Sequence, residues 1–176
     1  MEKPFLKTMI ITETGILSAL GLVLAGIKFF QLPNGGSISF SSFPILLLTA
    51  RRGTKAGIAG GLVFGFLSLI RRPFVVHPLQ FFLDYPIAYA TLGISGLIPW
   101  NSRVKMLGSI LGGSSLRLIC HFLAGVVFFS KPQDTIWAAV MISFTYNATF
   151  LIPEAILCFL LADQLRLKCP NLTERK

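Results

Sequence analysis

Residues 77–96 read HPLQFFLDYPIAYATLGISG, a stretch that is long enough and apolar enough to cross a bilayer. A membrane-spanning helix needs roughly 20 mainly apolar residues. The stretch nevertheless carries an ionisable carboxyl group, Asp84, followed at once by Tyr85 and Pro86. Ionisable groups inside a membrane cost roughly 2.5 kcal/mol or more on insertion scales, and they usually mark a site, a pathway or an internal pair. We therefore expect a spanning segment that carries a functional acid.

The composition of the whole chain is that of an integral membrane protein. Its 176 residues are 53% hydrophobic and 13% charged, with a mean hydropathy of +0.73, which is too apolar for a soluble domain of this length. The net charge is +9, but the basic residues lie in short clusters between apolar runs. This pattern favours topology signals over nucleic-acid binding. Three cysteines form no motif, so we expect no disulfide and no metal site.

Six apolar segments, separated by short turn-forming loops, predict an all-α bundle of six transmembrane helices. Every loop is short, so we expect one compact membrane domain over residues 1–176. The second segment is short for a span and requires tilt, extension through the preceding GGSIS or cover by other protein. The predicted helices are 9–30, 38–50, 54–70, 79–98, 104–129 and 138–162.

The distribution of Lys and Arg predicts that both termini are cytoplasmic, because cytoplasmic loops carry an excess of positive charge. With the N-terminus inside, four basic residues fall on the outer side, namely Lys28, Arg71, Arg72 and Lys131, and Arg117 lies within the membrane. The remaining eleven fall on the inner side: Lys3, Lys7, Arg51, Arg52, Lys55, Arg103, Lys105, Arg166, Lys168, Arg175 and Lys176.

Three intramembrane polar groups share the outer third of the predicted bundle. Counted at about 1.5 Å per helical residue, Asp84, His121 and Asn147 lie about 8, 12 and 14 Å below the outer ends of their helices. Arg117 and Glu154 lie deeper, at about 18 and 24 Å. The first three groups are therefore candidates for the lining of one pocket that opens to the outside.

Structural roles compete with this functional interpretation. Arg117 and Glu154 lie at similar depths and can form a helix-joining ion pair, and His121, one turn from Arg117, can serve as an interhelical donor. Asp84 differs, because no Lys or Arg in the outer third of a helix is available to it, although Arg71 or Arg72 could reach it from a loop. An unpaired carboxylate near a pocket mouth favours a cationic ligand.

Aromatic side chains are placed toward the outer half by the same count. Aromatic faces attract a desolvated organic cation by about 1–2 kcal/mol each, although aromatic belts are common in membrane proteins. The residues are Phe64, Phe74, Tyr85, Phe128, Phe129 and Trp137.

A proteolytic alternative depends on the sequence GISG at 93–96. It matches the GxSG of rhomboid-type intramembrane serine proteases, which also have six helices. Ser95 would lie about 24 Å from the outer face and His121 about 12 Å, whereas a nucleophile and its base need hydrogen-bond reach. This depth mismatch disfavours the protease. The chain also lacks a Walker sequence, GxGxxG and HExxH, so it carries no ATPase motif of its own.

Several sequence blocks carry a family resemblance. In order, RRGTKAGIAGGLVFGFLSLI, HPLQFFLDYPIAYATLGISGLI, RLICHFLAGVVFF and YNATFLIPEAIL resemble the thiamine-specific substrate-binding subunit (S-component) of energy-coupling factor transporters. The likeness runs over roughly residues 31–162. It implies a six-helix, multi-pass cell-membrane protein, not an enzyme, that captures thiamine from outside without a cofactor. A coupling subunit and two ATPases would drive uptake.

The resemblance also implies roles for individual residues. Asp84 and Tyr85 would lie at the thiazolium, while His121, Gly125 and Asn147 would hold the pyrimidine and neighbouring atoms. A permanent cation suits a carboxylate and aromatic faces, and an aminopyrimidine needs donors and acceptors.

Departures from the family pattern leave the ligand open. Some members place tryptophans at three positions where this chain has Gly35 or a neighbour of it, Phe64 and Phe129. Some also place an acid where this chain has Ser39. Phe64, Phe74 and Phe129 are included among the candidate binding residues. Phe offers a weaker cation-π face than Trp, so the affinity for a cation could be lower than in those members. The alternatives are lower affinity for thiamine, a pyrimidine or thiazole precursor, or another vitamin.

A surface for a partner is predicted on the first helix. Gly15 and Ala19 form a small-xxx-small pair, extended by Ser18, and such a surface lets another helix approach closely. Ordinary packing within the bundle is the alternative. Family members use an alanine-rich version of this stripe to dock the coupling subunit.

Overall fold

The computed structural model describes residues 2–33, 35–71, 74–131, 133 and 135–175. Arg72 and Lys176, which the charge count includes, lie outside them. Within the described residues, four helical stretches are long and apolar enough to cross a membrane. They are α1 (Glu2–Leu24), α2 (Phe43–Leu67) with the 3-10 turn η1 (Ser68–Arg71), α5 (Arg103–Phe128) and α6 (Ile136–Lys168).

The first helix is shorter at its C-terminal end than predicted. α1 ends at Leu24, and a small antiparallel ribbon follows, in which β1 (Lys28–Gln31) pairs with β2 (Ser37–Ser39) around a turn where Gly35 has φ 96°. The prediction of helix to residue 30 was therefore wrong, and so was the start of the second helix at residue 38. A short apolar run does not distinguish helix from strand by hydropathy alone.

A single element, α2, covers most of the two helices predicted at 38–50 and 54–70. Its backbone is interrupted at Gly53, whose φ of 80° and ψ of −176° are not helical, so two helices are merged across a kink. Only glycine adopts this region readily. The RRG break thus lies where the sequence suggested, and it divides α2 into two helical parts.

The segment quoted at the outset is helical but not one regular helix. It consists of α3 (Pro78–Phe82), the π-turn η2 (Leu83–Ile87), α4 (Ala88–Thr91) and the 3-10 turn η3 (Leu92–Leu97). Pro86 lies inside η2. Proline cannot donate to the carbonyl one turn back and clashes with it, and a π-turn accommodates such a break. The prediction of a regular helix over 79–98 was wrong for this reason.

The last two long helices match the predicted segments closely at their N-terminal ends. Ser102 caps α5 by accepting from Lys105 N at 3.3 Å, and Thr135 caps α6 by accepting from Ala138 N at 3.2 Å. α6 continues to Lys168, six residues past its predicted end. Its charged continuation is paired, since Asp163 contacts Arg166 and Arg103, each at 3.1 Å.

Three glycines on one face of α2 allow the broken segment to pack at backbone distance. A Cβ at Gly57, Gly61 or Gly65 would lie 2.9 Å from Gly93 Cα, 2.2 Å from the Tyr89 carbonyl oxygen and 2.4 Å from Pro86 Cα respectively. Glycine spacing of this kind lets helices in membranes approach closely. The contact fixes the position of η2, which carries Asp84.

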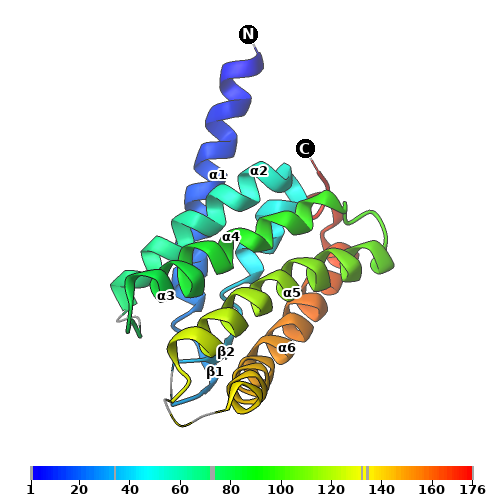
Figure 1. The fold of residues 1–176 in the computed structure, drawn as a ribbon. Coiled ribbons are helices and arrows are strands. Elements are labelled where there is room, and N and C mark those ends of the chain that lie inside the picture. The colour runs from blue at the N-terminus through cyan, green and yellow to red at the C-terminus, as the bar shows by residue number, and fades with distance from the viewer. Residues whose placement is uncertain (1, 34, 72–73, 132, 134, 176) are drawn as a thin grey trace.

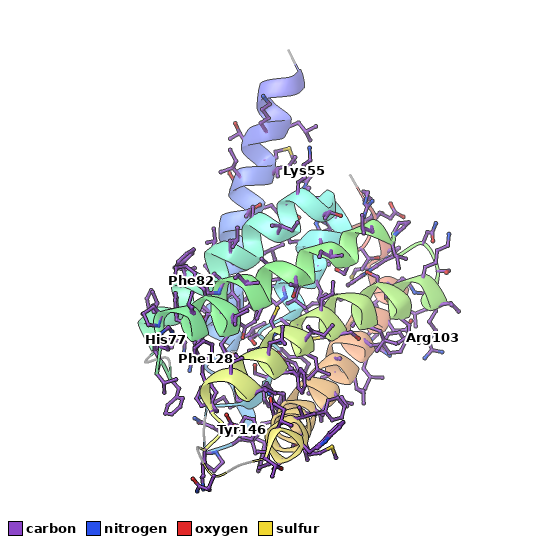
Figure 2. The ribbon with its side chains drawn as sticks, in the orientation of Figure 1. Lys55, His77, Phe82, Arg103, Phe128 and Tyr146 are labelled. Atoms are coloured by element: carbon purple, nitrogen blue, oxygen red, sulfur yellow. The ribbon has the colours of Figure 1, made fainter. Side chains whose placement is uncertain are left out.

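Both termini lie at one end of the molecule, and the β1–β2 ribbon lies at the other (Figure 1). Lys55 lies toward the end of the termini, whereas Tyr146 lies near the ribbon (Figure 2). An apolar core joins α2, η3, α5 and α6, with Phe64, Leu92, Met106 and Cys158 fully or almost fully buried.

Candidate functional site

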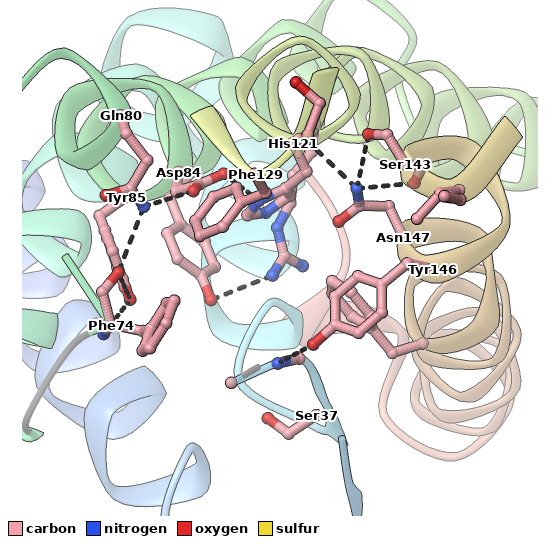
Figure 3. Close-up of a pocket in the computed structure, with 18 of the residues that line it drawn as sticks. Ser37, Phe74, Gln80, Asp84, Tyr85, His121, Phe129, Ser143, Tyr146 and Asn147 are labelled. Carbon is pink, nitrogen blue, oxygen red and sulfur yellow. Dashed lines mark hydrogen bonds and ion pairs between the residues drawn. The ribbon is translucent and has the colours of Figure 1, made fainter. Parts of the chain in front are cut away.

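A cavity of about 200 Å³ lies beside the ribbon, between the α3–η2 segment, α5 and α6 (Figure 3). Residues 35–37 of the ribbon loop contribute to its wall. Most of the remaining polar lining comes from helical segments far apart in the chain, including Gln80, Asp84, Arg117, His121, Ser143 and Asn147. The depth count from the sequence therefore grouped Asp84, His121 and Asn147 correctly.

Asp84 has two side-chain partners, one at each carboxylate oxygen. His121 Nδ1 lies 2.8 Å from Oδ1, and Gln80 Nε2 donates to Oδ2 at 2.5 Å. The Asp84 and His121 side chains are 14% and 12% exposed. The expectation of an unpaired carboxylate was therefore wrong. The search for partners of Asp84 considered only Lys and Arg, and it did not consider a histidine on a facing helix.

Gln80 is a functional candidate that sequence reasoning missed. It is 1% exposed, accepts from Val76 N at 3.1 Å and donates to the Phe74 carbonyl at 3.2 Å. It thus joins the loop before α3 to Asp84. The sequence did contain a signal that could have identified Gln80. It lies four residues before Asp84, a spacing that places two side chains on one helical face.

Asn147 and Gly125 lie where α5 and α6 approach each other. Asn147 Nδ2 donates to Ser143 O at 2.9 Å and to His121 O at 3.3 Å. A Cβ at Gly125 would lie 2.1 Å from Ser143 Oγ. Gly125 therefore keeps the two helices close enough for the Asn147 amide to reach across the interface.

The aromatic candidates separate into two groups. Phe74 and Phe129 line the cavity and stack with their centroids 5.8 Å apart, and the lining Tyr85 accepts from Phe74 N at 2.9 Å. Phe64 is 1% exposed and packs edge-on against Tyr89, outside the described lining.

Two further aromatics also point elsewhere. Phe128 stacks on His77 with centroids 5.0 Å apart, and Trp137 is 75% exposed. The depth count gave height along a helix but not the direction of a side chain around it.

The inner wall of the cavity is a buried ion-pair network. Arg117 Nη1 donates to Glu154 Oε2 at 2.7 Å and to Ser42 Oγ at 2.6 Å, and Arg117 Nη2 donates to Tyr89 Oη at 3.0 Å. Arg117 and Glu154 are 5% and 2% exposed. The pairing considered from the sequence is confirmed, and it leaves these two charges balanced beside the cavity.

The loop between β1 and β2 contacts α6 beside the cavity. Gly36 N donates to Tyr146 Oη at 3.2 Å (Figure 3), and a Cβ at Gly36 would lie 2.7 Å from the Phe150 ring. Glycine at this position allows the loop to lie against α6. The ribbon therefore covers the cavity at the end of the molecule opposite the termini (Figure 1).

The remaining candidates lie outside the cavity. Gly15 and Ala19 are exposed on α1, whereas Ser18 is buried and donates to Gly60 O at 3.0 Å, so Ser18 does not extend the stripe. Ser95 donates to Leu92 O at 2.7 Å and is not among the described lining residues, which separates it from His121.

Long apolar helices that enclose a polar, carboxylate-bearing cavity define a helical membrane protein with a small-molecule pocket. The chain belongs to the thiamine transporter protein family (Thia_YuaJ), whose sequence model matches residues 11–174. It is accordingly a multi-pass protein of the cell membrane.

Two curated relatives and one solved structure agree with this assignment. The chain is 34% identical over 178 residues to thiamine transporter ThiT of Bacillus subtilis, covering 91% of each chain, and 31% identical to ThiT of Lacticaseibacillus paracasei, covering 77% of each. ThiT from Listeria monocytogenes superimposes with a TM-score of 0.85 at 23% identity, over 96% of this chain and 98% of that one, which shows a shared fold.

Proposed function

We propose that this chain captures thiamine from outside the cell, as the substrate-binding subunit of an energy-coupling factor importer. The observation that carries the proposal is the oriented carboxylate of Asp84 in a cavity with stacked aromatic rings on one side and amide and imidazole groups on the other. Membership of the thiamine transporter family supports thiamine over other vitamins.

In this proposal the two halves of thiamine meet different walls. The permanently cationic thiazolium lies near Asp84, Tyr85 and the Phe74–Phe129 pair, because a carboxylate and aromatic faces both attract a cation. The neutral aminopyrimidine lies near His121 and Asn147, which offer donors and acceptors.

The proposed topology has six membrane crossings in one domain and both termini in the cytoplasm. α2 supplies two crossings through its kink at Gly53, and the α3–η3 segment supplies another. Support comes from the common end of the two termini (Figure 1) and from the excess of Lys and Arg assigned to that side. The cavity then faces outward.

The proposed role is transport without catalysis. A separate module of a coupling subunit and two ATPases supplies the energy, and the exposed Gly15–Ala19 surface of α1 contacts the coupling subunit within the lipid bilayer. No nucleic acid, metal or cofactor is required. Exposure of both small residues supports this surface, since ordinary packing within the bundle would bury them.

The direct test is calorimetric titration of purified protein with thiamine, its separate pyrimidine and thiazole moieties, riboflavin and biotin. Thiamine is expected to bind most tightly, and a tighter pyrimidine or thiazole moiety would assign the protein to a precursor instead. Calorimetry suits this chain better than tryptophan fluorescence, because neither tryptophan is among the described cavity-lining residues. Trp137 is 75% exposed and Trp100 lies in the core.

A further inference from the structure

The side-chain amide of Gln80 lines the cavity, yet all of its donors are used within the protein. Oε1 accepts from Val76 N at 3.1 Å, while Nε2 donates to the Phe74 carbonyl at 3.2 Å and to Asp84 Oδ2 at 2.5 Å. A primary amide has two N–H donors, so Nε2 has none left for a ligand. The geometry of Gln80 is therefore that of a group that holds other groups in place.

The two acceptors that Gln80 holds belong to the two parts of the site proposed for the cation. One is the Asp84 carboxylate, and the other is the backbone of Phe74, whose ring stacks on Phe129 with 22° between the planes. Phe74 N donates to Tyr85 Oη at 2.9 Å, so both backbone polar groups of Phe74 are held by side chains of the α3–η2 segment. Gln80 is 1% exposed, which keeps water from competing for these bonds.

The chemistry of these three bonds requires a neutral amide. The site at residue 80 presents one N–H to an acceptor and two acceptors to a donor, and a glutamine amide matches that set. A lysine would bring a charge that neutralises Asp84. An ionised glutamate would have no donor and would place a second negative charge beside the first. Gln80 thus orients the carboxylate and leaves its charge available to a ligand.

We propose that Gln80 is a positioning residue that ties the Phe74 wall and the Asp84 carboxylate into one cation-recognising unit. It acts through these two residues and contributes no donor to the ligand. The proposal rests on the proposed function and names the residue that sets the preference of the site for the cationic half of thiamine. Holding both contacts before the ligand arrives lowers the ordering cost of binding.

The test begins with Gln80→Met, which keeps the length of the side chain and removes its hydrogen bonds. Calorimetric titration of the full-length protein should show thiamine binding weakened roughly tenfold and binding of the neutral pyrimidine fragment weakened by less than about threefold. The matched control is Gln164→Met, since Gln164 is exposed on α6 and is not among the described lining residues. It should leave both affinities unchanged.

Double variants show whether Gln80 acts through its two targets. Gln80→Met is combined with Asp84→Asn and, separately, with Phe74→Leu. A positioning residue loses its effect when its target is removed, so each double variant should bind thiamine at least about threefold more tightly than the product of the single losses predicts. The titration stoichiometry gives the folded fraction, and the affinity gives the state of the site, so partial unfolding does not imitate this result.

Gln80→Lys provides a second variant for the same proposal. It keeps a donor toward Phe74 and Asp84 but adds a charge that neutralises the carboxylate. The ratio of thiamine affinity to fragment affinity should therefore fall in this variant as well, as it should in Gln80→Met.

The outcomes distinguish the positioning role from the proposed function. Thiamine binding by the wild type with an unchanged affinity ratio in the Gln80 variants would overturn the positioning role and leave the proposed function intact. Losses that multiply fully in both double variants would also overturn it, because Gln80 would then act independently of its targets. Failure of the wild type to bind thiamine would overturn the proposed function, and the positioning role with it.

Discussion

At the scale of single residues, Asp84 owes its orientation to neighbours from two different elements. Gln80 lies on the preceding turn, and His121 lies on α5. A carboxylate held at both oxygens loses little rotamer freedom when a ligand arrives, which reduces the entropic cost of binding. The same arrangement makes the negative charge of Asp84, more than its shape, the property that a cation would recognise.

Replacing Asp84 by Asn tests that charge. Asp84→Asn keeps the size of the side chain, removes its charge and retains one of its two accepting oxygens, and thiamine binding should weaken by about 1.5–3 kcal/mol, or roughly ten- to hundredfold. The neutral pyrimidine fragment should lose little, because its proposed contacts are with His121 and Asn147. Calorimetry of both ligands at matched detergent and salt provides the measurement, and equal losses for both would instead assign Asp84 a structural role.

At the scale of elements, the segment 77–98 depends on α2 for its shape. Pro86 breaks its helical hydrogen bonding, and the glycines at 57, 61 and 65 let its backbone lie directly against α2. Such contact leaves no room for a side chain between the two elements. The position of Asp84 in the cavity is therefore a consequence of glycine spacing on another helix.

Gly61→Ala should destabilise the protein by about 1–3 kcal/mol or more, because the new Cβ would meet the backbone oxygen of Tyr89 at 2.2 Å, which no rotamer change can relieve. Thermal unfolding in detergent, followed by circular dichroism, measures the effect. Gly112→Ala on α5 is the matched control, since its Cβ would have no atom within 4 Å and helix propensity favours alanine. Equal melting temperatures for the two variants would contradict the packing argument.

At the scale of the whole molecule, the Arg117–Glu154 pair ties α5 and α6 to the start of α2. Ser41 and Ser42 donate to Glu154 Oε1 at 3.2 and 3.0 Å, and Arg117 reaches Tyr89 on α4. One buried network thus connects elements that are distant in sequence. It also forms the inner wall of the cavity, so the stability of the bundle and the shape of the site are coupled.

Glu154→Gln should lower the free energy of unfolding by about 3–5 kcal/mol, since it leaves the Arg117 charge buried without a counter-charge. The double variant Arg117→Met with Glu154→Met should recover much of that loss, because hydrophobic replacement of a whole buried pair is often neutral. Chemical unfolding of the double variant and of the single variants Arg117→Met and Glu154→Met completes the cycle. Additive losses in the double variant would show that the pair is not coupled.

The exposed stripe on α1 gives a prediction for the assembled importer. Gly15→Trp or Ala19→Trp should abolish thiamine uptake by cells while leaving binding to the purified subunit unchanged, because a bulky ring blocks a close helix approach and neither position touches the cavity. Ile156→Trp, at a position 54% exposed on α6, is the control for a bulky ring on a lipid-accessible face. Loss of binding in the α1 variants would indicate a folding role.

Hydropathy and residue spacing alone determined the membrane class, the N-terminal ends of α5 and α6, the break at Gly53 and the shared depth of Asp84, His121 and Asn147. These properties depend on local composition and on the helical rise, which each segment carries by itself. The family resemblance read from the sequence blocks was confirmed by the match over residues 11–174.

Tertiary structure alone decided the ribbon after α1, the pairing of Asp84 with His121 and Gln80, and the placement of Phe64 behind Tyr89. Each depends on which way a side chain points and on what another element places opposite it. A sequence gives depth along a helix, but rotation around its axis is set by packing. For this reason the common depth of Asp84, His121 and Asn147 was predictable from the sequence, whereas Gln80 and the hydrogen-bond partners of these residues were not.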